Sequence, residues 1–349
     1  MHDPITLRSD LAALWQDFRR TPLVDLPSNA AAANIGRVLA KLECERPLGN
    51  FKSLGGTLAG LRALVRATGA SDIGALLSRD RSVRLPRLIC ASDGNHGLSV
   101  AAAARRAGTG ATIFLPASVD AFRAARIESV GGEVKRVEGT YDDAVDQARA
   151  CAARGEGLLI PDTSQDRADP VVQDVMSGYS IMTAELLEQF EDLSVRPTHA
   201  FVQAGVGGLA AAIADGLSEH PLELAVVEPE SAACVAIALR AGRPVLIAGE
   251  LKTSAEMLSC GLASAPALDV LLRQRAKSLL VGEALLAAGS GMLEDSGIQT
   301  TASGAAGVAG LMHVAQSDDL RRLHNLEITS VVLLMVTEAA AGDVLCYHK

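Results

Sequence analysis

The sequence predicts an α/β fold with two domains, each a mostly parallel sheet flanked by helices. Three observations lead to this prediction. Short aliphatic and β-branched runs alternate with longer alanine- and leucine-rich stretches of helical period, a pattern typical of parallel strands covered by helices. With 349 residues, 49% of them hydrophobic and 21% charged, the chain can bury a large core. Two polar segments, 78–86 and 162–170, interrupt the pattern and indicate domain boundaries.

The individual elements follow from this alternation. Strands are expected at residues 37–42, 88–91, 111–115, 133–137, 157–160, 199–203, 224–228, 278–281 and 330–336. Helices are expected at residues 53–68, 96–107, 121–130, 142–153, 171–191, 208–217, 232–241, 283–293 and 304–316. The two boundaries then place residues 1–86 and 168–349 in a larger domain and residues 87–167 in a smaller α/β domain.

The composition excludes several classes of partner. The net charge of −9 leaves no basic surplus for nucleic acid or an anionic membrane, so a small metabolite is the expected partner. Six cysteines without a C-x-x-C pair are typical of buried thiols in a reducing compartment, and no metal site is expected: Cys44, Cys90, Cys151, Cys234, Cys260 and Cys346. Without a signal-peptide pattern, and with apolar runs far below the roughly 20 residues that span a bilayer, a soluble cytoplasmic protein is expected.

A glycine-rich turn follows the expected strand 199–203. Gly205, Val206, Gly207, Gly208 and Leu209 open the next helix, and glycines at a helix N-terminus allow an anion to approach backbone N–H groups, which favours a phosphate. The alternative is a tight turn whose glycines serve packing only. The turn also fits G-x-G-x-x-A, with Glu228 ending the next strand about 20 residues later, so a nicotinamide-dependent oxidoreductase remains open.

A lysine stands at the start of an apolar helix, after the loop Pro47-Leu48-Gly49-Asn50-Phe51. The helix dipole disfavours a cation at this end, so Lys52 loses its proton more readily and becomes a better imine former. The alternative is a solvated surface lysine.

A second loop, Ser92-Asp93-Gly94-Asn95-His96-Gly97, lies between a strand and a helix. Its helix N-terminus can present N–H groups of Ser92, Gly94 and His96 to a substrate carboxylate, and Asn95 can bond a ring hydroxyl. The alternative is an N-cap with glycine hinges. The His96 side chain is interpreted as structural, since no partner spacing supports a metal or a catalytic triad.

These three motifs, in this order, resemble those of the fold-type II pyridoxal-phosphate (PLP) enzymes, the tryptophan-synthase β family. The resemblance extends from Thr21 to Thr337. It implies a homodimer whose larger domain binds PLP, with the active site in the cleft between the domains. It also implies that Lys52 holds PLP as a Schiff base, that Asn95 contacts its 3′-oxygen and that Gly205 to Leu209 cradle its phosphate. Thr337, otherwise a β-branched strand residue, would place its hydroxyl against the pyridine nitrogen.

Within that family the chain resembles the diaminopropionate ammonia-lyases. Asp93 stands where serine and threonine dehydratases carry a small neutral residue. Further signs are Tyr141-Asp142-Asp143, Pro161-Asp162-Thr163, Met176-Ser177-Gly178-Tyr179, Pro197-Thr198-His199, Gln203-Ala204-Gly205, Val227-Glu228-Pro229 and Val336-Thr337-Glu338. The resemblance implies that Asp93 and Asp162 handle protons while ammonia is eliminated from a small amino acid, 2,3-diaminopropionate, to give pyruvate. The alternatives are a helix cap for Asp93 and a turn acid for Asp162.

Two departures keep other activities open. Ala302 occupies the place of an acid, and residues 339–342 lack the polar stretch of the lyases. A serine/threonine dehydratase-like PLP lyase is therefore an alternative, and a non-catalytic PLP-binding relative is a more distant one.

Overall fold

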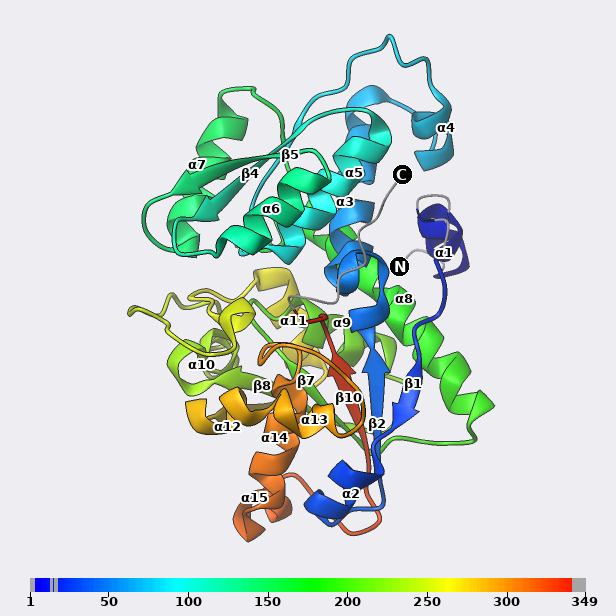
Figure 1. The fold of residues 1–349 in the computed structure, drawn as a ribbon, viewed down its shortest axis with the longest axis vertical. Coiled ribbons are helices and arrows are strands. Elements are labelled where there is room, and N and C mark those ends of the chain that lie inside the picture. The colour runs from blue at the N-terminus through cyan, green and yellow to red at the C-terminus, as the bar shows by residue number, and fades with distance from the viewer. Residues whose placement is uncertain (1–3, 13–14, 16–17, 341–349) are drawn as a thin grey trace. The chain divides into compact units, whose positions relative to one another are not determined.

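The computed structural model describes residues 4–12, 15 and 18–340, so Cys346 lies outside the described residues. The chain divides into two compact units, each built on one sheet (Figure 1). The first unit comprises residues 52–164 and 168–181 with the described residues before 20, and the second comprises residues 20–51, 165–167 and those from 182 on.

The sheet of the first unit has four parallel strands in the order β5-β4-β3-β6. The strands are β3 (Leu88–Ala91), β4 (Ala111–Pro116), β5 (Gly132–Val137) and β6 (Leu158–Leu159). β3 and β4 are buried at every residue, as expected of central parallel strands covered on both faces. Since parallel crossovers are right-handed, the return from β5 to β6 places α7 (Tyr141–Ala153) on the opposite face from α5 (Asn95–Ala107) and α6 (Ala121–Ser129).

The sheet of the second unit has six strands in the order β1-β2-β10-β7-β8-β9. The strands are β1 (Leu23–Asp25), β2 (Arg37–Leu42), β7 (His199–Gln203), β8 (Glu223–Pro229), β9 (Lys277–Val281) and β10 (Val331–Val336). All pairs are parallel except β1 with β2. The carboxyl ends of β7 and β10 therefore meet at one edge of the sheet, which is where ligands bind to open parallel sheets.

Helices and short 3-10 turns connect the strands. The α-helices are α1 (Pro4–Ala12), α2 (Pro27–Ala33), α3 (Lys52–Thr68), α4 (Ile73–Ser78), α5 (Asn95–Ala107), α6 (Ala121–Ser129), α7 (Tyr141–Ala153), α8 (Pro170–Asp192), α9 (Gly208–Gly216), α10 (Cys234–Ala241), α11 (Ala265–Arg273), α12 (Glu283–Ala288), α13 (Gly291–Glu294), α14 (Ala306–Ala315) and α15 (Asp318–Leu323). The 3-10 turns are η1 (Glu43–Glu45), η2 (Pro47–Gly49), η3 (Glu230–Ala232) and η4 (Glu256–Leu258).

The predicted α/β fold with mostly parallel sheets is confirmed, and each of the nine predicted strands is present with bounds shifted by two residues or fewer. The antiparallel β1 was not predicted, because three residues carry no readable period. The predicted helix 283–293 is in fact the two helices α12 and α13, and the helices α1, α2, α4, α11 and α15 were not predicted.

The two units differ from the predicted division at residues 86 and 168. Residues 52–86 and 168–181 belong to the unit with the four-stranded sheet, whereas the sequence placed them in the larger domain. Glycines on α3 permit its close packing on α5: a Cβ at Gly56 would lie 2.8 Å from Ser99 Cβ, and one at Gly60 would lie 3.1 Å from Ala103 Cβ.

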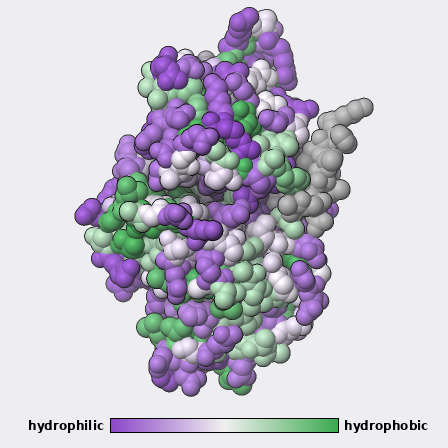
Figure 2. All heavy atoms as spheres, turned by 60° about the vertical axis from the view of Figure 1, so that its left-hand side comes forward, coloured by the Kyte–Doolittle hydropathy of each residue, from purple (hydrophilic) through white to green (hydrophobic). Residues whose placement is uncertain are grey.

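The surface carries mostly hydrophilic side chains on the face that Figure 2 shows. Large hydrophobic side chains are exposed at scattered positions: Val83, Phe122, Leu193, Leu246, Leu272, Leu323 and Ile328. Among the described residues, no helix combines the length and apolarity that crossing a bilayer requires.

Candidate active site

Lys52 is the first residue of α3, as predicted. Its Nζ donates a hydrogen bond of 2.6 Å to Asp162 Oδ2, and the Tyr141 hydroxyl donates one of 2.7 Å to Asp162 Oδ1. The side chain of Asp162 is 8% exposed and that of Lys52 is 25% exposed. The interpretation of Lys52 as a solvated surface residue is therefore wrong: its amine is held in a mostly buried ion pair within the first unit.

Asp162 is a carboxylate at neutral pH. Burial raises its pKa, but the neighbouring Lys52 ammonium, together with the hydrogen bonds from Lys52 and Tyr141, lowers that pKa below its ordinary value. The carboxyl group thus remains charged although little water reaches it.

Asp93, in contrast to Asp162, favours the protonated form of its carboxyl group. Asp93 precedes Gly94, the N-cap residue of α5, and the side chain that accepts a first-turn N–H of this helix is that of Ser92, which bonds Gly97 N at 2.8 Å, so the helix-cap alternative for Asp93 is wrong. Burial raises the pKa of Asp93 to about 7, against the attraction of Lys52. The first unit therefore holds one carboxylate and one carboxyl group that carries a proton near neutral pH, a division typical of acid–base pairs.

The loop around Asp93 is organised by Ser92. The Ser92 Oγ accepts hydrogen bonds from the N–H groups of Gly94 at 2.9 Å and Gly97 at 2.8 Å. The His96 Nε2 donates to Ile160 O at 2.8 Å, and burial lowers the pKa of this imidazole. Its side chain is structural, so only the His96 backbone N–H is left for a substrate carboxylate. The expectation is wrong for the other two N–H groups, because Ser92 N donates to Phe114 O at 3.0 Å and Gly94 N donates to Ser92 Oγ. Asn95 opens α5 and is 6% exposed.

The glycine-rich turn lies in the second unit, between β7 and α9. Gly207 is the N-cap residue with φ +98°, and within the described residues no side chain caps α9. The first intrahelical bond runs from Ala211 N to Gly207 O. The N–H groups of Gly208, Leu209 and Ala210 therefore precede the helical ladder and fit a phosphate group.

Thr337 directly follows β10 in the same unit and is 4% exposed. Its Oγ1 lies 3.2 Å from Gln203 Nε2, which donates toward it. Sequence reasoning assigns no role to Gln203 or Tyr141; the signal that could have identified Gln203 is an amide at the end of a strand that is buried at every residue.

Glu228 has a structural role. Its two carboxylate oxygens accept the N–H groups of Val235 and Ala236, each at 2.7 Å, at the start of α10. Because the side chain is fully buried, no oxygen is left for a ribose, and the dinucleotide interpretation of Glu228 is wrong.

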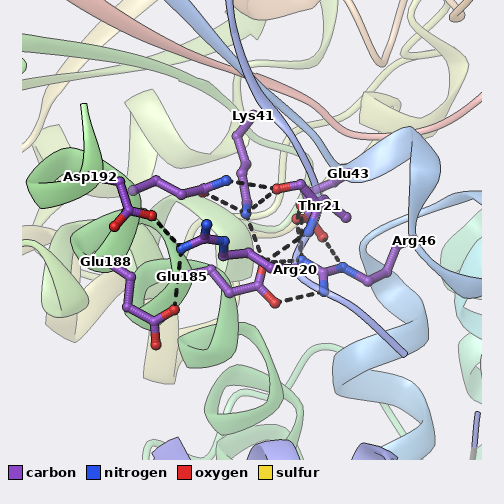
Figure 3. Close-up of polar contacts among 9 residues, drawn as sticks. Arg20, Thr21, Lys41, Glu43, Arg46, Glu185, Glu188 and Asp192 are labelled. Atoms are coloured by element: carbon purple, nitrogen blue, oxygen red, sulfur yellow. Dashed lines mark hydrogen bonds and ion pairs between the residues drawn. The ribbon is translucent and has the colours of Figure 1, made fainter. Parts of the chain in front are cut away.

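The second unit contains a buried group of charged side chains that the sequence analysis did not predict (Figure 3). Lys41 Nζ donates to Glu185 Oε2 at 2.7 Å, and Arg46 donates to both oxygens of Glu185 and of Glu43. These four side chains are 0% exposed, and we call them the buried charge cluster. Arg46 immediately precedes the loop that ends at Lys52.

The predicted site residues thus fall into two sets. Lys52, Asp93, Asn95 and Asp162 lie in the first unit, and the glycine-rich turn and Thr337 lie in the second. In the described part of the chain, no group of three His, Cys, Asp or Glu residues could hold a metal ion.

Comparison with known proteins shows which family the chain resembles. A family model described as pyridoxal-phosphate dependent enzyme matches residues 14–338. The diaminopropionate ammonia-lyase of Escherichia coli K12 is 28% identical over 337 residues, which cover 92% of this chain and 84% of that protein. A biosynthetic L-threonine dehydratase of Pasteurella multocida is 29% identical over 229 residues, covering 64% of this chain and 39% of that protein.

Solved structures give the same result. Holo diaminopropionate ammonia-lyase from Escherichia coli superposes with a TM-score of 0.86 and 27% identity, covering 97% of this chain and 89% of that one. Maize serine racemase shares the fold, with a TM-score of 0.76 and 20% identity over 97% of this chain and 93% of that one.

Proposed function

Because the chain belongs to the family of pyridoxal-phosphate dependent enzymes, we propose that it is an ammonia-lyase acting on 2,3-diaminopropionate or a close β-substituted amino acid. The observation that carries this proposal is that the unit that holds Lys52 also holds two different carboxyl groups, Asp162, which accepts hydrogen bonds from Lys52 and Tyr141, and Asp93, whose pKa burial raises to about 7. The relatives named diaminopropionate ammonia-lyase, which match over 92% of the chain, support it.

The residues present fit the cofactor. We propose that the Lys52 amine binds the PLP aldehyde, that the N–H groups of the turn 205–209 bind its phosphate, and that Asn95 and Thr337 bind the 3′-oxygen and the pyridine nitrogen. The uncapped α9 supports the phosphate position. One backbone bond supports the proposal that Lys52 and Thr337 bind the same cofactor molecule. Phe51 N donates to Thr337 O at 3.1 Å, and Lys52 is the next residue in the chain.

When bound, PLP stabilises negative charge at the Cα atom of an amino acid. In the proposed mechanism the Asp162 carboxylate takes the Cα proton, which requires the ionised form that the structure favours. When the β-nitrogen is in its neutral amine form, the Asp93 carboxyl gives it a proton as the Cβ–N bond breaks, so that it leaves as ammonia. Overall, diaminopropionate and one water yield pyruvate and two molecules of ammonia.

The Asp162 carboxylate also accounts for substrate choice. A β-ammonium group is attracted to the Asp162 carboxylate as the substrate enters, whereas the neutral β-hydroxyl of serine or threonine gains no such attraction. We therefore expect the amine substrate to be preferred over hydroxy amino acids.

A keto-acid release assay with diaminopropionate, serine and threonine tests the proposal. We expect the highest kcat/KM with diaminopropionate, and a loss of about 10²- to 10⁴-fold in Asp162→Asn and Asp93→Asn with PLP still bound. The control is Asp146→Asn, since Asp146 lies on α7 with a side chain 79% exposed. Preference for serine or threonine would show a dehydratase instead, and absence of turnover with PLP bound would show a non-catalytic relative.

A further inference from the structure

We propose that Gln203 is a positioning residue that fixes the direction of the Thr337 hydroxyl proton, so that this hydroxyl donates to its ligand. The inference rests on the proposed function, in which that ligand is the pyridine nitrogen of PLP. It assigns a role to a side chain that ends β7, immediately before the glycine-rich turn.

The orientation of the Gln203 amide is determined by its neighbours. Nε2 lies 3.1 Å from Ser303 O, 3.0 Å from Gly304 O and 3.0 Å from Met335 O. Carbonyl oxygens only accept hydrogen bonds, so the amide nitrogen must face them; a flipped amide would bring four oxygens together. The same nitrogen is then 3.2 Å from Thr337 Oγ1.

The other end of the amide makes no hydrogen bond that would favour a different orientation. Gln203 is 2% exposed, and its Oε1 has no hydrogen-bond partner among the described residues. A Cβ at Gly307 would lie 3.3 Å from this oxygen. Leaving a buried acceptor without a hydrogen bond costs free energy, so the contacts of the amide nitrogen with the three carbonyl oxygens must outweigh that cost.

The hydroxyl of Thr337 can therefore take only one role toward Gln203. An amide nitrogen has no lone pair available for a hydrogen bond, so Thr337 Oγ1 accepts from it and cannot donate to it. Within the described residues no acceptor is found for the hydroxyl proton. That proton is left for a ligand, and a ligand nitrogen that accepts it must be unprotonated.

The test measures the ring nitrogen itself. The holoenzyme is loaded with PLP carrying ¹⁵N in the pyridine ring, and the ¹⁵N chemical shift is followed from pH 6 to 9. We expect an unprotonated, hydrogen-bonded nitrogen in the wild type and in Thr337→Ser. In Gln203→Leu nothing holds Thr337 Oγ1 as an acceptor, so its hydroxyl can rotate away from the ring nitrogen, and the pKa of that nitrogen should rise by about one unit, a tenfold shift typical of one hydrogen bond.

A double-mutant cycle with Thr337→Val separates the possible failures. If Gln203 acts through Thr337, Gln203→Leu changes nothing further in the Thr337→Val background. A ring nitrogen that responds to Thr337→Val but not to Gln203→Leu overturns the inference and leaves the proposed function intact. No response to Thr337→Val overturns the proposed position of Thr337, and the inference with it. Should Gln203→Leu fail to fold, the wild-type spectrum decides, because a protonated nitrogen at neutral pH contradicts the role of Gln203.

Discussion

The two acids of the first unit show how the surroundings of a residue decide its chemistry. Asp162 receives hydrogen bonds from Lys52 and Tyr141, whereas the pKa of Asp93 is dominated by burial. Identical side chains therefore favour opposite protonation states near neutral pH. A base and an acid are both available without a histidine in either role.

The raised pKa of Asp93 makes stability depend on pH. The folded state binds this proton up to about pH 7 and the unfolded state only up to about pH 4, so the free energy of unfolding falls as pH rises between these values. Asp93→Asn removes this dependence. We expect the PLP-free variant to exceed the wild type in stability at pH 8, by up to about 4 kcal/mol, and to match its pH dependence below pH 4.

Urea unfolding of the PLP-free proteins at pH 5 and pH 8 measures the effect, with Asp146→Asn as the exposed control. A wild-type protein whose stability stays level between these two pH values would contradict the burial argument for Asp93.

The sequence could predict single residues better than their partners. Lys52 was identifiable because a helix start, a polar loop and a following apolar face can all be read locally. Its ion-pair partner Asp162 is 110 residues away, and Tyr141 joins the pair from another helix. Proximity of this kind is set by the order of strands in the sheet, which no local pattern contains.

At the scale of elements, the buried parallel strands were predictable because their apolar runs are bounded by turn residues. The glycine-rich turn before α9 was predictable for the same reason. The buried charge cluster was not: Lys41 interrupts an apolar strand, and Glu185 lies on α8 far along the chain. The role of a charged residue in the core can be predicted only when the position of its ion-pair partner is known.

The start of α9 depends on Gly207. At φ +98° an L-residue is strained by roughly 1–2 kcal/mol, and a distorted turn misdirects the N–H groups proposed to bind phosphate. We expect Gly207→Ala to weaken PLP binding at least about tenfold, measured by cofactor fluorescence titration. The matched control is Gly242→Ala, with φ +66° and open space around it. Equal PLP affinity in both variants would contradict the phosphate role.

The buried charge cluster should be a strong determinant of stability. Arg46→Leu leaves the carboxylates of Glu43 and Glu185 without their main partner in a fully buried place, and breaking such a pair costs about 3–5 kcal/mol. Thermal unfolding should show a large decrease in Tm. Arg196→Leu is the control, because its ion pair with Glu191 is 77% exposed on both sides and contributes under about 1 kcal/mol. Equal effects of the two changes would show that the cluster is not electrostatically important.

At the scale of the whole molecule, the proposed cofactor-binding residues are divided between the two units. Lys52 and Asn95 belong to the first, and the turn 205–209 and Thr337 belong to the second. Each unit alone therefore offers only part of the proposed contacts to PLP: the first supplies the lysine amine, and the second supplies the N–H groups for the phosphate. If one PLP molecule uses both, its binding free energy stabilises both units together.

Hydrogen exchange with and without PLP tests this coupling. We expect PLP to slow amide exchange at the start of α3 in the first unit and at the start of α9 in the second. Gly207→Ala, which alters only the second unit, should reduce the protection in both, because the cofactor that reaches Lys52 is then held less tightly. Protection confined to one unit, or a Gly207→Ala effect confined to α9, would mean that the lysine and the glycine-rich turn do not bind the same molecule.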